Sequence, residues 1–235
     1  MLRCSALLLA LPLTAQDAPP PPVKLTLDLG FVNTAGNTDV TTLNAGEKLE
    51  YKTDGLTLTQ TFSVVYARTA GVTNTSQWKG GLRADYALTG LVGVFALGAF
   101  ERNAFAGLDR RFEEAAGLAA KILTGDANQL NAEVGASLNQ QRSVDGTATR
   151  FAAGRLALAY RRGFTATAYG TLSGEFLPTF QNLDDYRING EAAIVAPISA
   201  RIATKLSYVV KFDNVPEPTF QTTDRVFTAG LQITF

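Results

Sequence analysis

The chain has 235 residues, of which 46% are hydrophobic and 18% are charged, so it is a folded protein of one or two domains and not a disordered one. Lysine and arginine together number 21, as do aspartate and glutamate, so no basic field exists that would attract nucleic acid. The absence of histidine removes the commonest general base and metal ligand, and the single cysteine, Cys4, excludes an internal disulfide.

The N-terminal residues have the pattern of an export signal. Arg3 precedes an apolar run over residues 5–13, which is too short to cross a bilayer as a helix. We therefore expect a signal peptide over residues 1–15, cleaved after Ala15 or alternatively after Ala18. A proline-rich linker is expected over residues 16–23, and the mature chain would then contain no cysteine.

The remaining residues, 24–235, alternate apolar and polar side chains with a period of two and nowhere sustain the spacing of an amphipathic helix. We predict an all-β chain that forms a transmembrane antiparallel up-and-down β-barrel of twelve strands. Tight turns are expected at 52–55, 89–90, 124–126, 161–163 and 196–197, and longer polar connections at 33–39, 68–76, 103–110, 141–149, 177–185 and 212–222.

Strict alternation of the two kinds of connection places both termini on the side of the tight turns. Bacterial outer-membrane barrels have this arrangement, with short periplasmic turns and longer extracellular loops. A miscounted hairpin would change the total within a range of roughly 10 to 14 strands.

Side-chain parity within the predicted strands tests this fold, because a strand in a bilayer must turn its apolar side chains toward lipid. Leu130 and Val134 lie on one face of their strand, and Glu133 lies on the other. The strands near residues 80 and 230 alternate in the same way. Two features depart from the pattern: Glu47 is in phase with outward apolar residues, and the strand over 91–102 is apolar on both faces.

Aromatic residues on the outward parity gather near strand ends, as expected where rings meet lipid headgroups. The row toward the longer connections contains Tyr66, Trp78, Phe100, Phe112, Phe176, Tyr186 and Tyr208, and the row toward the tight turns contains Tyr51, Tyr86, Tyr160, Phe164 and Phe235. The alternative is a soluble secreted β-sandwich with these rings in its core. A sandwich does not need two aromatic rows, so the barrel is favoured.

Three segments carry a resemblance to a known family: residues 35–39 (AGNTD), residues 100–111 (FERNAFAGLDRR), and the ending from Tyr208 to Phe235. Together they resemble the salt-induced outer-membrane proteins, a bacterial β-barrel family of undefined function. Asn103 and Leu108 stand where the family pattern has Asp and Ile. The resemblance implies a location in the outer membrane and recognition of the final strand, with Phe235, by the barrel-assembly machinery. It implies no substrate and no catalytic residue.

The inner parity of the predicted strands is rich in charge of both signs. The lumen-facing charged residues are expected to be Lys48, Glu50, Lys79, Arg83, Asp85, Glu101, Glu133, Arg155, Glu175, Arg187, Glu191, Arg201 and Lys205. Opposite charges at close range pair and brace a wall, since leaving one of them unpaired is costly. A barrel of this size leaves the width of the lumen open, so a structural, ion-paired interior and a narrow channel are both retained. Rings of one sign, which a strongly selective pore would carry, are absent from the sequence pattern.

Catalysis is not expected, and neither a cofactor nor a metal is expected. Outer-membrane hydrolases use histidine to activate a nucleophile or water, and this chain has none. Glu101 with Asp109, or Asp184 with Asp185, would be the available carboxylate pairs, but loop carboxylates usually form turns. The oxygen-bearing side chains around 107–109 and 213–224 would either order the loops or bind a hard cation such as calcium.

We therefore expect a non-catalytic outer-membrane barrel of the cell envelope, with a structural or salt-stress role. The alternatives are a porin-like passive channel for small solutes or ions, and a soluble secreted β-protein.

Overall fold

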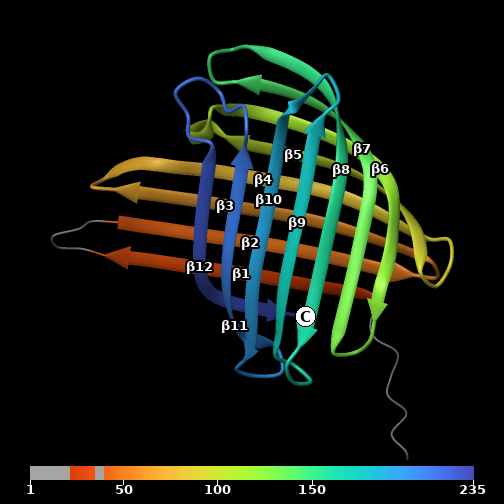
Figure 1. The fold of residues 1–235 in the computed structure, drawn as a ribbon. Helices are drawn as coiled ribbons and strands as arrows, with labels where there is room; N and C mark the ends of the chain where they lie inside the picture. Colours follow the sequence, from red (N-terminus) through yellow and green to blue (C-terminus); the bar gives the residue numbers. More distant parts are fainter. Residues whose placement is uncertain (1–21, 35–39) are drawn as a thin grey trace, which may run out of the picture.

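The computed structural model describes residues 22–34 and 40–235 of the chain (Figure 1). The expected signal peptide over residues 1–15, most of the predicted linker, and residues 35–39 of the first long connection lie outside the described residues.

Twelve antiparallel strands form one closed barrel in which each strand pairs with its neighbours in the sequence (Figure 1). The strands are β1 (Val23–Thr34), β2 (Val40–Thr53), β3 (Leu56–Thr69), β4 (Val72–Ala87), β5 (Val92–Asn103), β6 (Leu108–Thr124), β7 (Asn128–Ser143), β8 (Ala148–Gly163), β9 (Tyr169–Thr179), β10 (Asn182–Pro197), β11 (Ile202–Asp213) and β12 (Thr223–Thr234). The predicted fold class, an antiparallel barrel of twelve strands, is confirmed.

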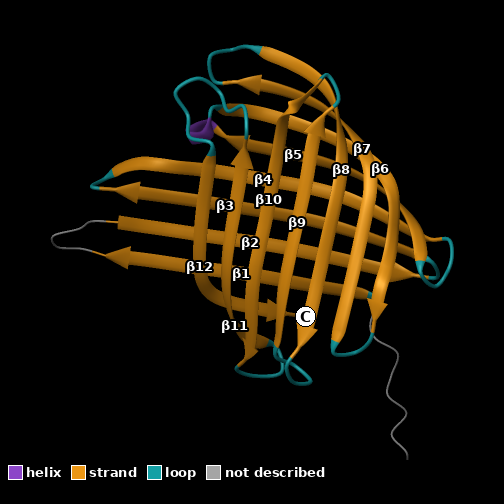
Figure 2. Ribbon diagram, viewed as in Figure 1, coloured by secondary structure: helices purple, strands orange, loops and turns teal. Residues whose placement is uncertain are grey.

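A short 3-10 helix, η1 (Ala104–Ala106), connects β5 to β6 and stands out among the strands and loops of Figure 2. No helix of the described residues has the length and apolar character that crossing a membrane would require.

The barrel closes where β1 meets β12. Their register runs over five residue pairs, from Thr26 with Thr234 to Gly30 with Gly230, whereas β1 and β2 share twelve pairs. Position 230 must be glycine for this approach, because a Cβ atom there would collide with the carbonyl oxygen of Leu29. We call these five pairs the closing seam.

Two connections that the sequence predicts to be long are tight turns. Strands β3 and β4 pair as far as Thr69 and Val72, which leaves only Ala70 and Gly71 in the turn. Both turn residues have positive φ angles, 50° and 77°, the conformation of a type I′ hairpin turn. The connection between β9 and β10 is likewise reduced to residues 180–181. Polar residues continue the strands because backbone hydrogen bonds, and not apolar side chains, hold these extensions together.

The outward faces of the strands are apolar, as predicted. The exposed fraction of Val134 is 52% and that of Phe227 is 65%. The apolar inner face of β5 is explained by Phe95, which is only 3% exposed and lies inside the barrel. Glu47 keeps its unusual outward position, opposite Leu27 and Phe62 in the register. The structure supplies no partner for its carboxylate among the described residues.

The structure rules out a β-sandwich, because the strands form one ring and not two stacked sheets. The buried apolar side chains of the described residues are few, namely Phe95, Leu108, Ala115, Ala153, Leu177, Ala193 and Val195. Most large apolar side chains face outward instead. The alternative of a soluble sandwich with an aromatic core is therefore wrong.

Candidate functional site in the barrel lumen

A chain of ion pairs inside the barrel joins four strands of the wall. Arg83 on β4 lies 2.6 Å from Asp85 of the same strand and 2.8 Å from Glu133 on β7. Glu133 also lies 3.3 Å from Arg155 on β8, and Arg155 lies 2.7 Å from Glu175 on β9. Alternate residues of a strand face the same side, so the inner parity delivers all five side chains to one space. Each carboxylate of this chain has at least one guanidinium partner.

An aromatic ring supports the two arginines of this chain. The guanidinium carbon of Arg83 lies 4.6 Å from the centroid of the Phe95 ring, and that of Arg155 lies 5.9 Å from it. A guanidinium within about 6 Å of a ring is attracted to the electron-rich face. Phe95 thus contacts both cations within the central chain of ion pairs.

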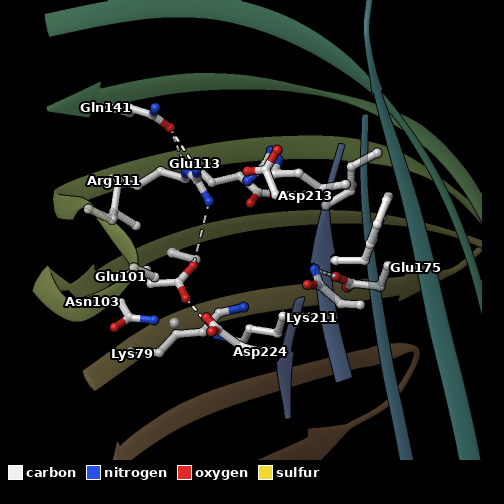
Figure 3. Close-up of a pocket in the computed structure, with 18 of the residues that line it drawn as sticks. Lys79, Glu101, Asn103, Arg111, Glu113, Gln141, Glu175, Lys211, Asp213 and Asp224 are labelled. Carbon is white, nitrogen blue, oxygen red and sulfur yellow. Dashed lines mark hydrogen bonds and ion pairs between the residues drawn. The ribbon is translucent and has the colours of Figure 1, made fainter. Parts of the chain in front are cut away.

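A second cluster crosses the lumen from one wall to the other (Figure 3). Glu101 on β5 lies 2.6 Å from Lys211 on β11, although these strands are six positions apart around the ring. Arg111 on β6 lies 3.8 Å from Glu101 and donates hydrogen bonds of 2.6 and 3.0 Å to Gln141 on β7. Gln77 donates a further hydrogen bond of 3.0 Å to Glu101. Side chains therefore narrow the lumen at this level.

The longest described connection, residues 214–222, folds over the same end of the lumen. Its Glu217 carboxylate accepts hydrogen bonds from the Ser143 hydroxyl and, at 3.4 Å, from the Gln141 amide. Gly107 has a φ of +80° and lies so close to Glu217 that a Cβ atom would not fit. This connection is therefore fastened to the inside of the barrel and not extended away from it.

A third cluster braces the wall on both sides of the closing seam. Lys205 on β11 lies 2.6 Å from Asp28 on β1 and 3.8 Å from Glu191 on β10. Gln232 on β12 donates a 3.0 Å hydrogen bond to Asp28 and accepts one of 3.0 Å from the Tyr169 hydroxyl on β9. The first strand is thus linked through side chains to the last four strands.

The space between the clusters includes cavities of about 270, 330 and 430 Å³. Lys79 and Lys211 line all three of them, so the cavities meet at these two side chains. Figure 3 shows both lysines in the first cavity, with Glu101 between them and the rest of the cross-lumen cluster. Lys79 forms no ion pair with any described residue, which leaves its ammonium group available to the free space.

The residues predicted from sequence to line the lumen are mostly found in these clusters. Lys48 and Glu50 form a separate pair at 3.3 Å, and Arg187 donates a 3.3 Å hydrogen bond to the buried Asn139. Arg201 differs from the expectation: β11 begins at Ile202, so Arg201 lies in the exposed turn before the wall.

Sequence reasoning missed four charged residues of the lumen. Lys211 and Asp28 follow the parity of their strands and were detectable by continuing the alternation. Arg111 follows a register shift between Leu108 and its neighbours, which interrupts the alternation. Glu217 belongs to a loop, where parity has no meaning, so no sequence signal pointed to it.

The loop carboxylates order the connections. In the part of the chain that the structure describes, no group of three or more His, Cys, Asp or Glu residues is arranged to hold a metal ion. Asp213 accepts a 3.1 Å hydrogen bond from the backbone of Val215, and Asp109 lies 4.0 Å from Arg102. The contact of Asp213 with Val215 favours loop ordering over a cation site.

The closed ring, the apolar outward faces and the charged lumen define the fold of outer-membrane β-barrels. The NanC porin has a similar structure, with a TM-score of 0.54 and 7% identity over 89% of this chain and 98% of that chain. The KdgM porin in complex with disordered oligogalacturonate gives a TM-score of 0.51 and 9% identity, over 89% and 99% of the two chains. The translocator domain of the autotransporter NalP from Neisseria meningitidis gives 0.51 and 11%, over 93% and 90%. At such identities the likeness is one of fold alone.

The family model described as "Protein of unknown function, DUF481" matches residues 27–235, so the chain belongs to the DUF481 family. No curated protein matches the sequence. The family description assigns no function, and the salt-induced character implied by the resemblance stays a prediction. The function therefore has to be inferred from the lumen itself.

Proposed function

We propose that this chain is a bacterial outer-membrane protein whose barrel is a narrow, passive channel for small hydrophilic solutes or ions. The observation that carries the proposal is the meeting of three cavities, each lined in part by charged side chains, at Lys79 and Lys211. Eight-stranded barrels are filled by their side chains and much larger ones hold open channels, so free space decides the case of twelve strands. Each cavity is several times the roughly 30 Å³ that one water molecule occupies in the liquid.

The outward surface supports the membrane location. Trp78, Phe100 and Phe112 form a continuous aromatic row on β4–β6, with ring centroids 5.6 and 4.9 Å apart. Such rows lie at the headgroup level of a bilayer. In this orientation the end that carries the turns 54–55, 88–91, 125–127, 164–168 and 198–201 lies in the periplasm. The final strand, with Phe235, is then recognised by the barrel-assembly machinery after the signal peptide is removed. The proposed function requires no catalysis, because passive passage of a solute makes and breaks no covalent bond.

A structural role in the cell envelope is the second candidate, and the contact between Glu101 and Lys211 favours it. This ion pair joins opposite walls at 2.6 Å. It stiffens the barrel and reduces the open cross-section of the lumen. A salt-stress role, as the family resemblance implies, would be compatible with such a braced wall.

Single-channel recording in planar bilayers separates the two candidates. We expect small, uniform conductance steps from the refolded mature chain, and larger steps from Lys211→Ala, which removes the cross-lumen pair. Lys52→Ala, in the strand end before the first tight turn, should leave the step size unchanged. A protein that fractionates with the outer membrane but gives no steps, with or without Lys211, would reject the channel and leave the structural role.

A further inference from the structure

Four arginines lie side by side on the outward face of the barrel, at the end that carries the connection 214–222. They are Arg102 on β5, Arg110 on β6, Arg142 on β7 and Arg150 on β8, and we call them the arginine row. All four are exposed. Their outward direction follows from their chain neighbours, because Glu101, Arg111, Gln141 and Phe151 make their contacts inside the lumen.

The register of the strands brings these side chains together. Arg110 and Arg142 are directly opposite each other, which places their Cα atoms about 4.5 to 5.5 Å apart. Arg150 pairs with Gln140, two residues from Arg142, and is therefore a diagonal neighbour on the same face. The pairing of β5 with β6 is irregular at Arg102, because Glu101 pairs with Arg111 and Asn103 pairs with Leu108. Arg102 therefore lies across from Arg110. The row is thus contiguous over four adjacent strands.

The protein does not neutralise this row. Like charges directly opposite each other destabilise a sheet, yet Arg110 and Arg142 form no ion pair with any described residue, and neither does Arg150. Arg102 has one partner, Asp109, at 4.0 Å, with side chains that are 47% and 36% exposed. A pair at that distance and exposure contributes little.

Two other carboxylates are near the arginine row but do not neutralise its charge. Asp145, in the connection between β7 and β8, accepts a 2.8 Å hydrogen bond from the backbone of Thr147. Glu114 shares the outward face of β6 but is four residues from Arg110, which is about 13 Å along a strand, and Phe112 lies between them. The arginine row therefore keeps a net positive charge at the surface.

The row sits at a defined depth, next to the aromatic row of β4–β6. Arg102 is opposite Trp78 in the register, and Arg110 is two residues from Phe112 in the direction of the loops. If aromatic rings mark the headgroup boundary, the guanidinium groups lie just beyond it, where lipid phosphates are found. Below the row the same strands present exposed apolar side chains, among them Leu138 and Leu156.

We propose that the arginine row binds the phosphate groups of an anionic lipid in the outer leaflet, with the acyl chains of the lipid against β5–β8. The inference rests on the proposed membrane location and orientation, and it does not depend on the channel. Guanidinium groups match phosphate oxygens in a two-pronged geometry, and a phosphate between Arg110 and Arg142 would replace their repulsion with two attractive contacts. The chemistry selects a lipid that carries phosphate monoesters, because two to four adjacent arginines need more than one negative charge.

The test uses the refolded barrel in detergent micelles and native mass spectrometry. The probe lipid is a diphosphorylated glycolipid, lipid A, compared with its monophosphorylated form and with zwitterionic phosphatidylcholine. Wild type is compared with the triple variant Arg110→Gln, Arg142→Gln, Arg150→Gln and with the single variant Arg142→Gln. Arg225→Gln is the matched control, because Arg225 is an outward, exposed arginine on β12 at the same end of the barrel. A gel shift on boiling shows that each variant is folded.

We expect the diphosphorylated lipid to bind most tightly, and the triple variant to lose at least about tenfold in affinity. The single variant should show an intermediate loss and Arg225→Gln none. Equal binding by wild type and the triple variant would overturn the proposal. So would equal binding of phosphatidylcholine, or competition by millimolar inorganic phosphate that abolishes the preference for the lipid.

The outcome is separable from the fate of the proposed function. A barrel that binds the lipid but conducts no ions would keep the arginine row and reject the channel. A conducting barrel with no lipid preference would do the reverse. A chain absent from the outer-membrane fraction would remove the setting on which the arginine row depends.

Discussion

Neighbouring residues of one strand meet very different surroundings in this barrel. Val134 is 52% exposed on the outward face of β7, while Asn131 of the same strand lines the 330 Å³ cavity. The same substitution at the two positions therefore separates the lipid side of the wall from the lumen side.

Val134→Arg should lower the free energy of unfolding in lipid vesicles by about 2 to 4 kcal/mol, because the charge is forced into hydrocarbon. Asn131→Arg should cost well under half of that, since its side chain enters a cavity that Glu133, Glu175 and other charged residues line. Denaturant titration of both variants in the same vesicles measures the difference. Equal losses would contradict the facing that we assign to β7.

Glu133 is the branch point of the central ion-pair chain, since it serves Arg83 and Arg155 together. Glu133→Ala should cost about 3 to 5 kcal/mol in unfolding free energy, because two guanidiniums in a confined space lose their shared partner. Glu50→Ala is the control: its partner Lys48 is 49% exposed, so the loss should stay within about 1 kcal/mol. A loss for Glu133→Ala as small as for Glu50→Ala would show that the chain of pairs adds nothing to stability.

Individual lumen residues were only partly predictable from the sequence. Alternation assigns Glu133 and Arg155 to the inner face, but it does not reveal which carboxylate meets which guanidinium across several strands. Alternation also cannot distinguish solvent-accessible positions on that face from packed ones. Ser137 shares the parity of Asn131 but is only 2% exposed, and it accepts a 2.9 Å hydrogen bond from Asn139. Such differences arise from three-dimensional packing between strands that are distant in the sequence.

At the level of elements, the Glu217 carboxylate fastens the middle of the connection 214–222 to the inside of the barrel. Glu217→Ala should free this connection from Ser143 and Gln141, which we expect to make residues 214–222 sensitive to limited proteolysis and to increase fluctuations of the channel current. Glu217→Gln is the conservative variant, because its amide oxygen still accepts a hydrogen bond from Ser143. The assignment fails if Ala and Gln variants behave alike and both match wild type.

The strands were more predictable than the connections between them. A two-residue period identifies a strand wherever one face is apolar, and this condition holds throughout the predicted membrane region. Beyond that region both faces of a strand are polar, so the extension of β4 over residues 73–76 shows no alternation of apolar and polar side chains. The turn at Ala70-Gly71 was for this reason hidden within a segment that the sequence predicts to be a long connection.

For the whole molecule, we expect the balance of charge in the lumen to set the ion selectivity of the proposed channel. The 270 Å³ cavity is lined by six basic and six acidic side chains, so the wild-type channel should discriminate little between small cations and anions. Lys79→Glu replaces the one lysine at the meeting point that has no ion-pair partner among the described residues, and we expect the double variant with Lys211→Glu to prefer cations strongly.

Reversal potentials in a potassium chloride gradient measure this selectivity. Wild type should reverse near zero and the double variant toward the potassium potential, with Lys52→Glu, outside the cavities, as the control. An unchanged reversal potential in the double variant would mean that ions do not pass Lys79 and Lys211.

The architecture as a whole follows from the regular alternation of residues 24–235. In a bilayer, only a closed ring of strands gives every backbone donor and acceptor a hydrogen-bond partner.

The closing seam adds a kinetic requirement. β12 follows the other eleven strands in the chain, so until it docks onto β1 the sheet has two unprotected edges that attract other chains. A contact of five pairs must then complete the ring between segments some 200 residues apart in sequence, the kind of distant pairing that forms slowly and invites aggregation. On the proposed route to the outer membrane, we therefore expect a holding factor to shield both edges until the ring is closed.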